Sequence, residues 1–213
     1  MILTPIPREH LPAALDRFTE RLGDPAARAA FARIRATSPE RAAGETAERH
    51  RREALEFARH RGMAVHPPGA RPGVNWDGAA LDGNTEAYVI LHEVAHFALA
   101  PPERRCLVDF GLGPGPDTTD REAAERAAIL PILEREADEA AASLLGILWE
   151  ASLGQPALAS YLDQNWLEGI DRSAPAHFTG VLIDLRRRGL LDWESGRLGP
   201  ADRRSALGEA ADP

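Results

Sequence analysis

The stretch Tyr88–Pro102, YVILHEVAHFALAPP, decides how this chain folds. It predicts a helix that is apolar on nearly every side, yet His92, Glu93 and His96 stand in its middle. A helix that is apolar all round is normally buried. A buried charged group must be paired, hydrogen-bonded or bound to a metal. The stretch therefore predicts a central helix that carries a polar site inside the protein.

The three polar residues match the pattern His-Glu-x-x-His. Positions i and i+4 of a helix lie on one face, so the imidazoles of His92 and His96 can reach one ion. The alternative is a pair of core histidines that are satisfied by hydrogen bonds without a metal. We favour a metal because the surrounding residues are so apolar.

A third ligand is expected on the helical run that follows Pro131. On a helical wheel centred on Leu148, Glu134 falls on the apolar stripe at roughly 40°. On the same wheel Glu136 and Glu139 point away from this stripe, toward solvent. The wheel therefore predicts Glu134 as the third metal ligand, beside the two histidines.

Two further carboxylates are candidates for supporting roles. Asp138 follows Glu134 by one helical turn, a spacing that suits a carboxylate orienting a ligating histidine through its other ring nitrogen. Asp109 could hydrogen-bond such a histidine or order the loop over the metal, and a turn-forming aspartate is the alternative.

Two histidines and one glutamate fit two kinds of metal chemistry. With Zn²⁺ and an activated water, Glu93 would act as the general base of peptide hydrolysis. With Fe(II), the same ligands form a facial triad with open positions for oxygen and substrate, and Glu93 would only hold the site together. The ligands alone leave both chemistries open.

Three further segments extend the pattern beyond the helix. They are RRCLVDFG (Arg104–Gly111), LEREADEAAASLLGILWEASLG (Leu133–Gly154) and QNWLEG (Gln164–Gly169). Together with the His-Glu-x-x-His helix, this order of segments resembles the bacterial elongation factor P hydroxylase family, and RRCLVDFG is its most specific part. The resemblance covers residues 91–169.

The resemblance implies a hydroxylase that uses non-haem Fe(II), with Zn²⁺ the other candidate metal. Its ligands, carried over by position, would be His92, His96 and Glu134. It also implies a protein substrate, either a modified lysine of elongation factor P or another protein. The competing resemblance is to compact zincin-like metallopeptidases, and an inert structural metal site is the third alternative.

The composition argues against several classes of protein and of chemistry. The chain has 213 residues, 44% of them hydrophobic, and a net charge of −8, which argues against binding nucleic acid. No apolar run approaches the roughly 20 residues of a membrane span, so we predict a cytoplasmic protein. One cysteine excludes an intramolecular disulfide, and all 25 basic residues are arginine, which excludes lysine chemistry.

The expected fold is α+β and predominantly helical. An N-terminal helical lobe (residues 1–62) would pack on a metal-binding core (residues 63–213). In that core the metal helix would cross the Glu134 helix as in zincins, beside a small sheet built from the Met63–Trp76 and Cys106–Gly111 regions. Pro131 is expected to break or kink the long helical run around it.

Overall fold

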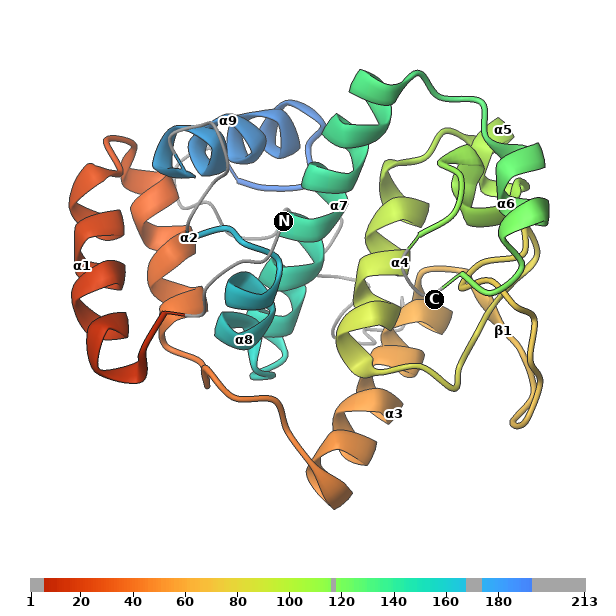
Figure 1. Ribbon diagram of the computed structural model, residues 1–213, viewed down its shortest axis with the longest axis horizontal. Helices are drawn as coiled ribbons and strands as arrows, with labels where there is room; N and C mark the ends of the chain where they lie inside the picture. Colours follow the sequence, from red (N-terminus) through yellow and green to blue (C-terminus); the bar gives the residue numbers. More distant parts are fainter. Residues whose placement is uncertain (1–5, 116–117, 168–173, 193–213) are drawn as a thin grey trace, which may run out of the picture.

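The computed structural model describes residues 6–115, 118–167 and 174–192, and this part of the chain is mostly helical, as predicted (Figure 1). The longer helices are α1 (Leu11–Arg21), α2 (Pro25–Arg35), α3 (Gly44–His60), α4 (Ala87–Leu99), α6 (Arg121–Ala127), α7 (Ile132–Ser152), α8 (Ala157–Asp163) and α9 (Ala174–Arg187). The shorter elements are η1 (Arg8–His10), α5 (Pro102–Arg105), η2 (Val108–Gly111), β1 (Ala64–Val65) and β2 (Ala80–Leu81).

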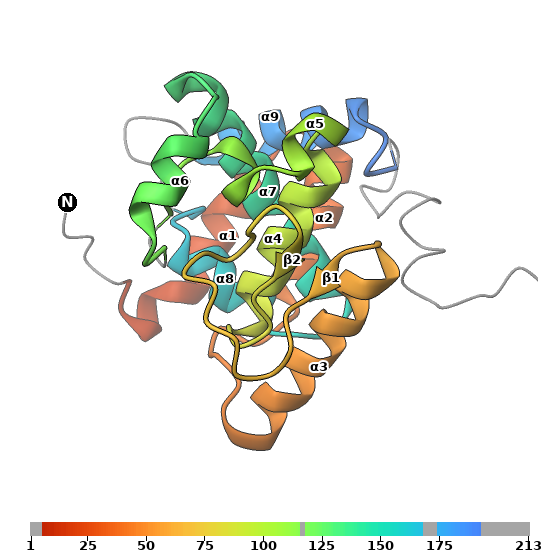
Figure 2. The ribbon, with the colours of Figure 1, turned by 90° about the vertical axis from the view of Figure 1, so that its right-hand side faces the viewer.

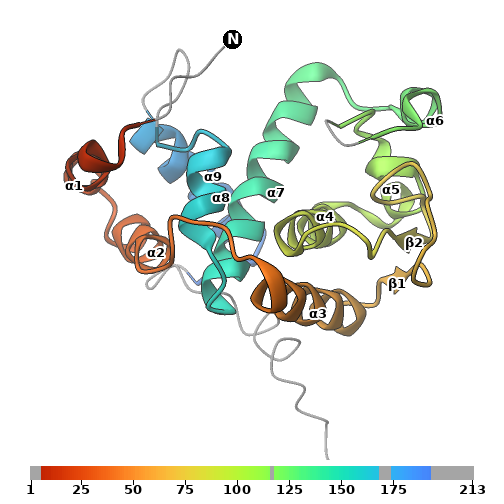
Figure 3. The ribbon, with the colours of Figure 1, turned by 60° about the horizontal axis from the view of Figure 1, so that its bottom comes forward.

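Helix α7 occupies the middle of the molecule and is covered on two sides. It packs against α4 on one side and against α2, α8 and α9 on the other (Figure 3). One continuous hydrophobic core includes Phe31 and Phe57 as well as Leu91 and Trp149. The core thus joins residues on both sides of position 62, and the proposed division into a lobe and a core remains a prediction.

Helix α4 is buried along most of its length, as its apolar sequence predicts. Ile90, Leu91 and Val94 are fully buried, and the helix also packs against α3. On the α7 side the two backbones come close at Gly146, where an added Cβ atom would lie 3.3 Å from the Cα atom of His92. The close approach brings the side chains of the two helices into one site. Whether the two helices cross as in zincins remains a prediction.

The small sheet differs in part from the prediction. Strand β1 falls in the expected Met63–Trp76 region, but it pairs in parallel with β2, and Trp76 bridges to Leu81. The Cys106–Gly111 region forms no strand, because it contains the tight turn η2. The two strands and their loops lie over α4 beside α3 (Figure 2).

The predicted break at Pro131 is confirmed. Helix α6 ends at Ala127, and α7 begins directly after the proline. Ile132 and Leu133 on the first turn of α7 are 64% and 75% exposed, so this turn extends beyond the core. No helix in the described part of the chain is both long enough and apolar enough to cross a lipid bilayer.

Candidate metal centre

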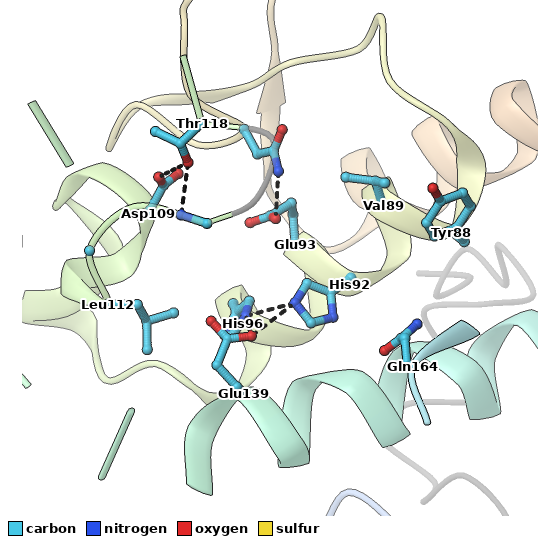
Figure 4. Close-up of a pocket in the computed structure, with 13 residues that line it drawn as sticks. Tyr88, Val89, His92, Glu93, His96, Asp109, Leu112, Thr118, Glu139 and Gln164 are labelled. Atoms are coloured by element: carbon cyan, nitrogen blue, oxygen red, sulfur yellow. Dashed lines mark hydrogen bonds and ion pairs between the residues drawn. The ribbon is translucent and has the colours of Figure 1, made fainter. Parts of the chain in front are cut away.

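Two helices bring three potential ligand atoms together. Helix α4 carries His92 and His96, whose Nε2 atoms are 3.0 Å apart. Helix α7 supplies Glu139, whose Oε2 atom lies 3.4 Å from Nε2 of His92 and 3.5 Å from Nε2 of His96. Figure 4 shows the three side chains converging beside a cavity. Among the described residues, these three form the one group of donors arranged to hold a metal ion.

The spacing of these atoms fits a single ion. Nitrogen and oxygen ligands bind zinc at about 2.0–2.2 Å, and ligands at that radius in tetrahedral or octahedral positions stand roughly 3.0–3.5 Å apart. The observed separations fall in this range. All three atoms approach from the two helices, so the remaining positions of the ion would face the cavity. The identity of the metal does not follow from these three donors.

Glu134 was predicted as the third ligand, but the donor group in the structure contains Glu139 in its place. Glu134 lies exposed on the protruding first turn of α7 and is not part of the donor group. The wheel assumed one buried stripe centred on Leu148, but α7 is covered on two sides. Glu139 lies nine residues from Leu148, which is about half a turn around the helix. It therefore faces α4, on the side that the wheel assigned to solvent.

The other ring nitrogen of His96 is held by a buried ion pair. Oδ2 of Asp138 lies 3.2 Å from Nδ1 of His96, and NH2 of Arg104 lies 3.1 Å from the same oxygen. Nε of Arg104 also donates to the carbonyl of Phe110 at 2.9 Å. Such a carboxylate keeps the proton on Nδ1 and turns Nε2 toward the ion. Asp138 was predicted for this position, whereas the burial of Arg104 was not predicted.

The charges around His96 leave a proton in the site when no ion is bound. Burial would lower the pKa of His96, but hydrogen bonds to Asp138 and Glu139 outweigh it and raise this pKa well above its usual range. Burial would raise the pKa of Glu139, but the two histidines hold it well below its usual range. Binding of a metal would therefore displace a proton.

Glu93 faces the same cavity without being one of the donors. It is only 6% exposed, and one carboxylate oxygen accepts a hydrogen bond of 3.1 Å from Nδ2 of Asn75. Asn75 lies in the loop before β2 and was not singled out from the sequence, because nothing in a loop rich in glycine and proline marks it. The Asn75 amide holds the Glu93 carboxylate beside the three donors, where it could contact a water molecule bound to the ion.

The turn η2 forms the inner wall of the site. Asp109, Phe110 and Gly111 have φ angles of 42°, 54° and 73°, and this left-handed conformation is strained for the two residues that are not glycine. The ring of Phe110 stacks on His96 with centroids 5.7 Å apart. Asp109 accepts hydrogen bonds from Trp76 N and Thr118 Oγ1. It therefore orders the loops around the cavity and makes no hydrogen bond to a histidine.

Asp109 is also electrostatically coupled to the site. Burial and the nearby charge of Glu93 raise its pKa to about 6, so the carboxyl group exchanges a proton near neutral pH. Thr118, which donates to it, is a further site residue that the sequence did not reveal.

The donors lie between two hollows. A cavity of about 270 Å³ on one side is lined by Asn75, Glu93 and Asp109, and one of about 620 Å³ on the other side by Trp166 and His177. His92, Gly113, Gly115, Glu139 and Gln164 line both hollows. The metal would therefore be reached from a cleft with two arms.

The segments quoted from the sequence thus come together around one centre. Gln164, the first residue of the Gln164–Gly169 element, lines both hollows, while its last two residues lie outside the described part of the chain. Comparisons of the chain with protein-family models, with curated proteins and with solved structures find no match.

Proposed function

We propose that this protein is a metal-dependent hydroxylase that binds Fe(II) through His92, His96 and Glu139. The observation that carries the proposal is the position of the RRCLVDFG segment, the most specific part of the resemblance to the elongation factor P hydroxylases. Arg104 from this segment braces Asp138 against His96, and Phe110 stacks on the same imidazole. The segment that carries the resemblance therefore supports one of the proposed metal ligands, His96.

The donor set is suited to this chemistry. Bound Fe(II) would supply the activation of dioxygen, in which one oxygen atom enters a C–H bond of the substrate. The other leaves as water, with two electrons and two protons from an external reductant and solvent. Two neutral histidines and one carboxylate are the usual ligands of such iron centres. Asp138 sets the tautomer of His96, and Glu139, with a side chain that is 47% exposed, borders the open side.

The substrate that the resemblance implies is a protein side chain. The two hollows on either side of the donors give such a side chain room to enter from one arm while its flanking groups occupy the other. Elongation factor P with a modified lysine, or another protein, would fit this description. The long hydrocarbon stem of a modified lysine would lie along the predominantly apolar walls that are usual for such pockets.

A zinc peptidase is the second candidate, and Glu93 is the observation that favours it. Its carboxylate faces the cavity and is held in place by Asn75. A zinc-bound water at the open position would have a carboxylate beside it to take its proton, which is the role of the glutamate in His-Glu-x-x-His peptidases.

The experiment begins with protein purified without oxygen and without a metal-affinity column, because zinc displaces iron(II) from most sites of this kind. Metal content is measured, and the metal-free protein is then loaded with Fe(II) or Zn²⁺. The hydroxylase predicts oxygen consumption by the iron form with a reductant present, and a mass increase of one oxygen atom in elongation factor P from the same cell.

A different result would reject each of the two candidate functions. Cleavage of a casein substrate by the zinc form, lost in Glu93→Gln, together with no oxygen consumption by the iron form, would replace the hydroxylase by the peptidase. If neither metal binds in stoichiometric amounts, both candidates are wrong. Glu134→Gln serves as the control throughout, because that carboxylate is exposed and lies outside the donor group.

A further inference from the structure

A second large cavity lies away from the metal donors and has no part in the proposed function. Its volume is about 680 Å³. It is open to solvent and is lined by α3, the start of α4, the end of α7, α8 and the segments next to them. Among the described residues, Tyr88 alone lines both this cavity and the 270 Å³ cavity at the metal donors.

The wall of this cavity contains a buried carboxylate with incomplete hydrogen bonding. The Glu150 side chain is only 3% exposed. Its Oε2 atom accepts a hydrogen bond of 2.7 Å from Ser160 Oγ and lies 3.8 Å from NH1 of Arg41. No residue in the described part of the chain donates a hydrogen bond to the other oxygen, Oε1. This oxygen is not one of the fully buried atoms that have no partner, so it keeps contact with solvent and a ligand in the cavity could reach it.

Arg41 neutralises Glu150 only in part, because its NH1 atom lies 3.8 Å from Oε2 while the same guanidinium also serves other partners. Two of its nitrogens lie 2.9 and 3.1 Å from Oδ2 of Asp163, the third donates to Ser160, and its plane covers the ring of Tyr88. Burial therefore dominates the environment of the carboxylate and raises the pKa of Glu150 to about 7. The cavity holds a negative charge that the protein leaves only partly compensated.

The whole lining shows the same excess of negative charge. Four acidic and two basic side chains line the cavity, which gives a formal charge of −4 + 2 = −2 once the pH is above the pKa of Glu150 and this group is ionised. The second arginine, Arg51, is paired with Glu48 and with the carbonyl of Gly83. Burial lowers the pKa of His50, so this imidazole adds no positive charge at neutral pH. The remaining lining is partly apolar, with Ala42, Ala47, Ala87, Tyr88 and Pro156.

We propose that this cavity binds a small aliphatic diamine, with one ammonium group on Glu150. The excess charge of −2 matches a dication, and the alanine and proline side chains suit a short methylene chain. An inorganic divalent ion fits poorly, because calcium takes six to eight oxygen ligands and magnesium a tight octahedron. One carboxylate beside one hydroxyl, in a cavity of about 680 Å³, does not provide either arrangement.

The test is calorimetric titration of the full chain at pH 8 and low salt with three probes that share a four-carbon chain. Putrescine carries two charges, n-butylamine one and 1,4-butanediol none. We expect putrescine to bind at one site, butylamine at least tenfold more weakly and the diol not at all. Raising the salt concentration should weaken the binding of putrescine, since the attraction is between charges.

Two variants act in opposite directions. Glu150→Gln should weaken putrescine at least tenfold, and Glu134→Gln, on the exposed start of the same helix, should leave it unchanged. Arg41→Gln removes a positive charge from the cavity and should bind putrescine more tightly. The proposal is overturned if the wild type binds none of the probes, if Glu150→Gln binds putrescine as well as the wild type, or if the diol binds equally well. Weaker binding by a folded Arg41→Gln would also overturn it.

Discussion

Oδ2 of Asp138 in α7 lies 3.2 Å from Nδ1 of His96 in α4, so the helix that supplies Glu139 also orients one of the two histidines. We expect Asp138→Asn to weaken metal binding by about 10–100-fold, the usual effect of losing such a partner. The amide neither carries the charge nor pairs with Arg104. Titration of the metal-free protein with Zn²⁺ measures the effect, and Glu134→Gln, an exposed carboxylate on the same helix outside the donor group, is the matched control. Equal affinity in Asp138→Asn would show that His96 needs no such support.

The third ligand can be decided by a pair of alanine variants. Glu139→Ala should lose stoichiometric metal, because it removes the only carboxylate oxygen next to both Nε2 atoms in the described structure. Glu134→Ala should keep the metal of the wild type, since that side chain is exposed. The measurement is the metal content after dialysis, determined by inductively coupled plasma mass spectrometry. The reverse result, with metal lost only in Glu134→Ala, would restore the assignment made from the helical wheel.

Glu150 should make the protein less stable as the pH rises. Its pKa is raised from 4.5 to about 7 in the folded state, so the unfolded chain releases the proton first. The free energy of unfolding then falls between these two pH values, by up to about 3 kcal/mol for a single group. Glu150→Gln removes this loss. We expect the variant to be about 1–3 kcal/mol more stable than the wild type at pH 8, and nearly equal at pH 5.

Urea denaturation at the two pH values measures this difference. Because other groups titrate in both proteins, only the difference between variant and wild type reports on Glu150. A difference that does not change between pH 5 and pH 8 would mean that the carboxyl group titrates normally.

Asp24 should act in the opposite sense at acid pH. It caps α2 by accepting from Ala26 N and Ala27 N, and it pairs with Arg186 of α9. Chiefly through Arg186, its pKa is lowered from 3.8 to about 2. Its stabilising effect is therefore complete above pH 4 and is lost as the pH falls through 2.

Two substitutions separate the contributions of Asp24. Asp24→Ala should cost about 1–2 kcal/mol at pH 7 through loss of the helix cap. Asp24→Asn keeps a capping oxygen and should lose only the ion pair, so its difference from the wild type should shrink toward pH 2. Thermal unfolding between pH 2 and pH 7 follows both variants. Equal losses in the two variants at pH 7 would assign the whole effect to the ion pair.

The sequence contained enough information to predict the central helix but not its surroundings. An apolar helix with two histidines on one face must be buried, and a proline within a helical run must break it; both follow from local rules. The choice between Glu134 and Glu139 depends on how many neighbours cover α7, and that is a property of the whole fold. A single apolar stripe cannot reveal that the small residues Ala142 and Gly146 form a second buried face.

The structure of the inner wall of the site could not be predicted from the sequence for a different reason. Asp109 and Phe110 adopt left-handed angles that their residue types do not favour, so local preference pointed to an extended segment. Arg104 can be buried because Asp138 and the Phe110 carbonyl accept hydrogen bonds from its guanidinium. The residues next to Arg104 in the sequence do not indicate these partners. Asn75 reaches Glu93 across a long loop. In each case the information lies in a contact between distant segments.

Gly146 lets α4 and α7 approach each other closely at the donor group. Because it has no side chain, α4 and α7 touch backbone to backbone beside His92, which limits how far apart the backbones that carry the histidines and Glu139 stand. A methyl group at this position would act as a spacer. It would keep all three donor residues but move the two helices apart, so the donor atoms would suit a larger ion. The spacing of the donor atoms thus depends on a residue that is not itself a donor.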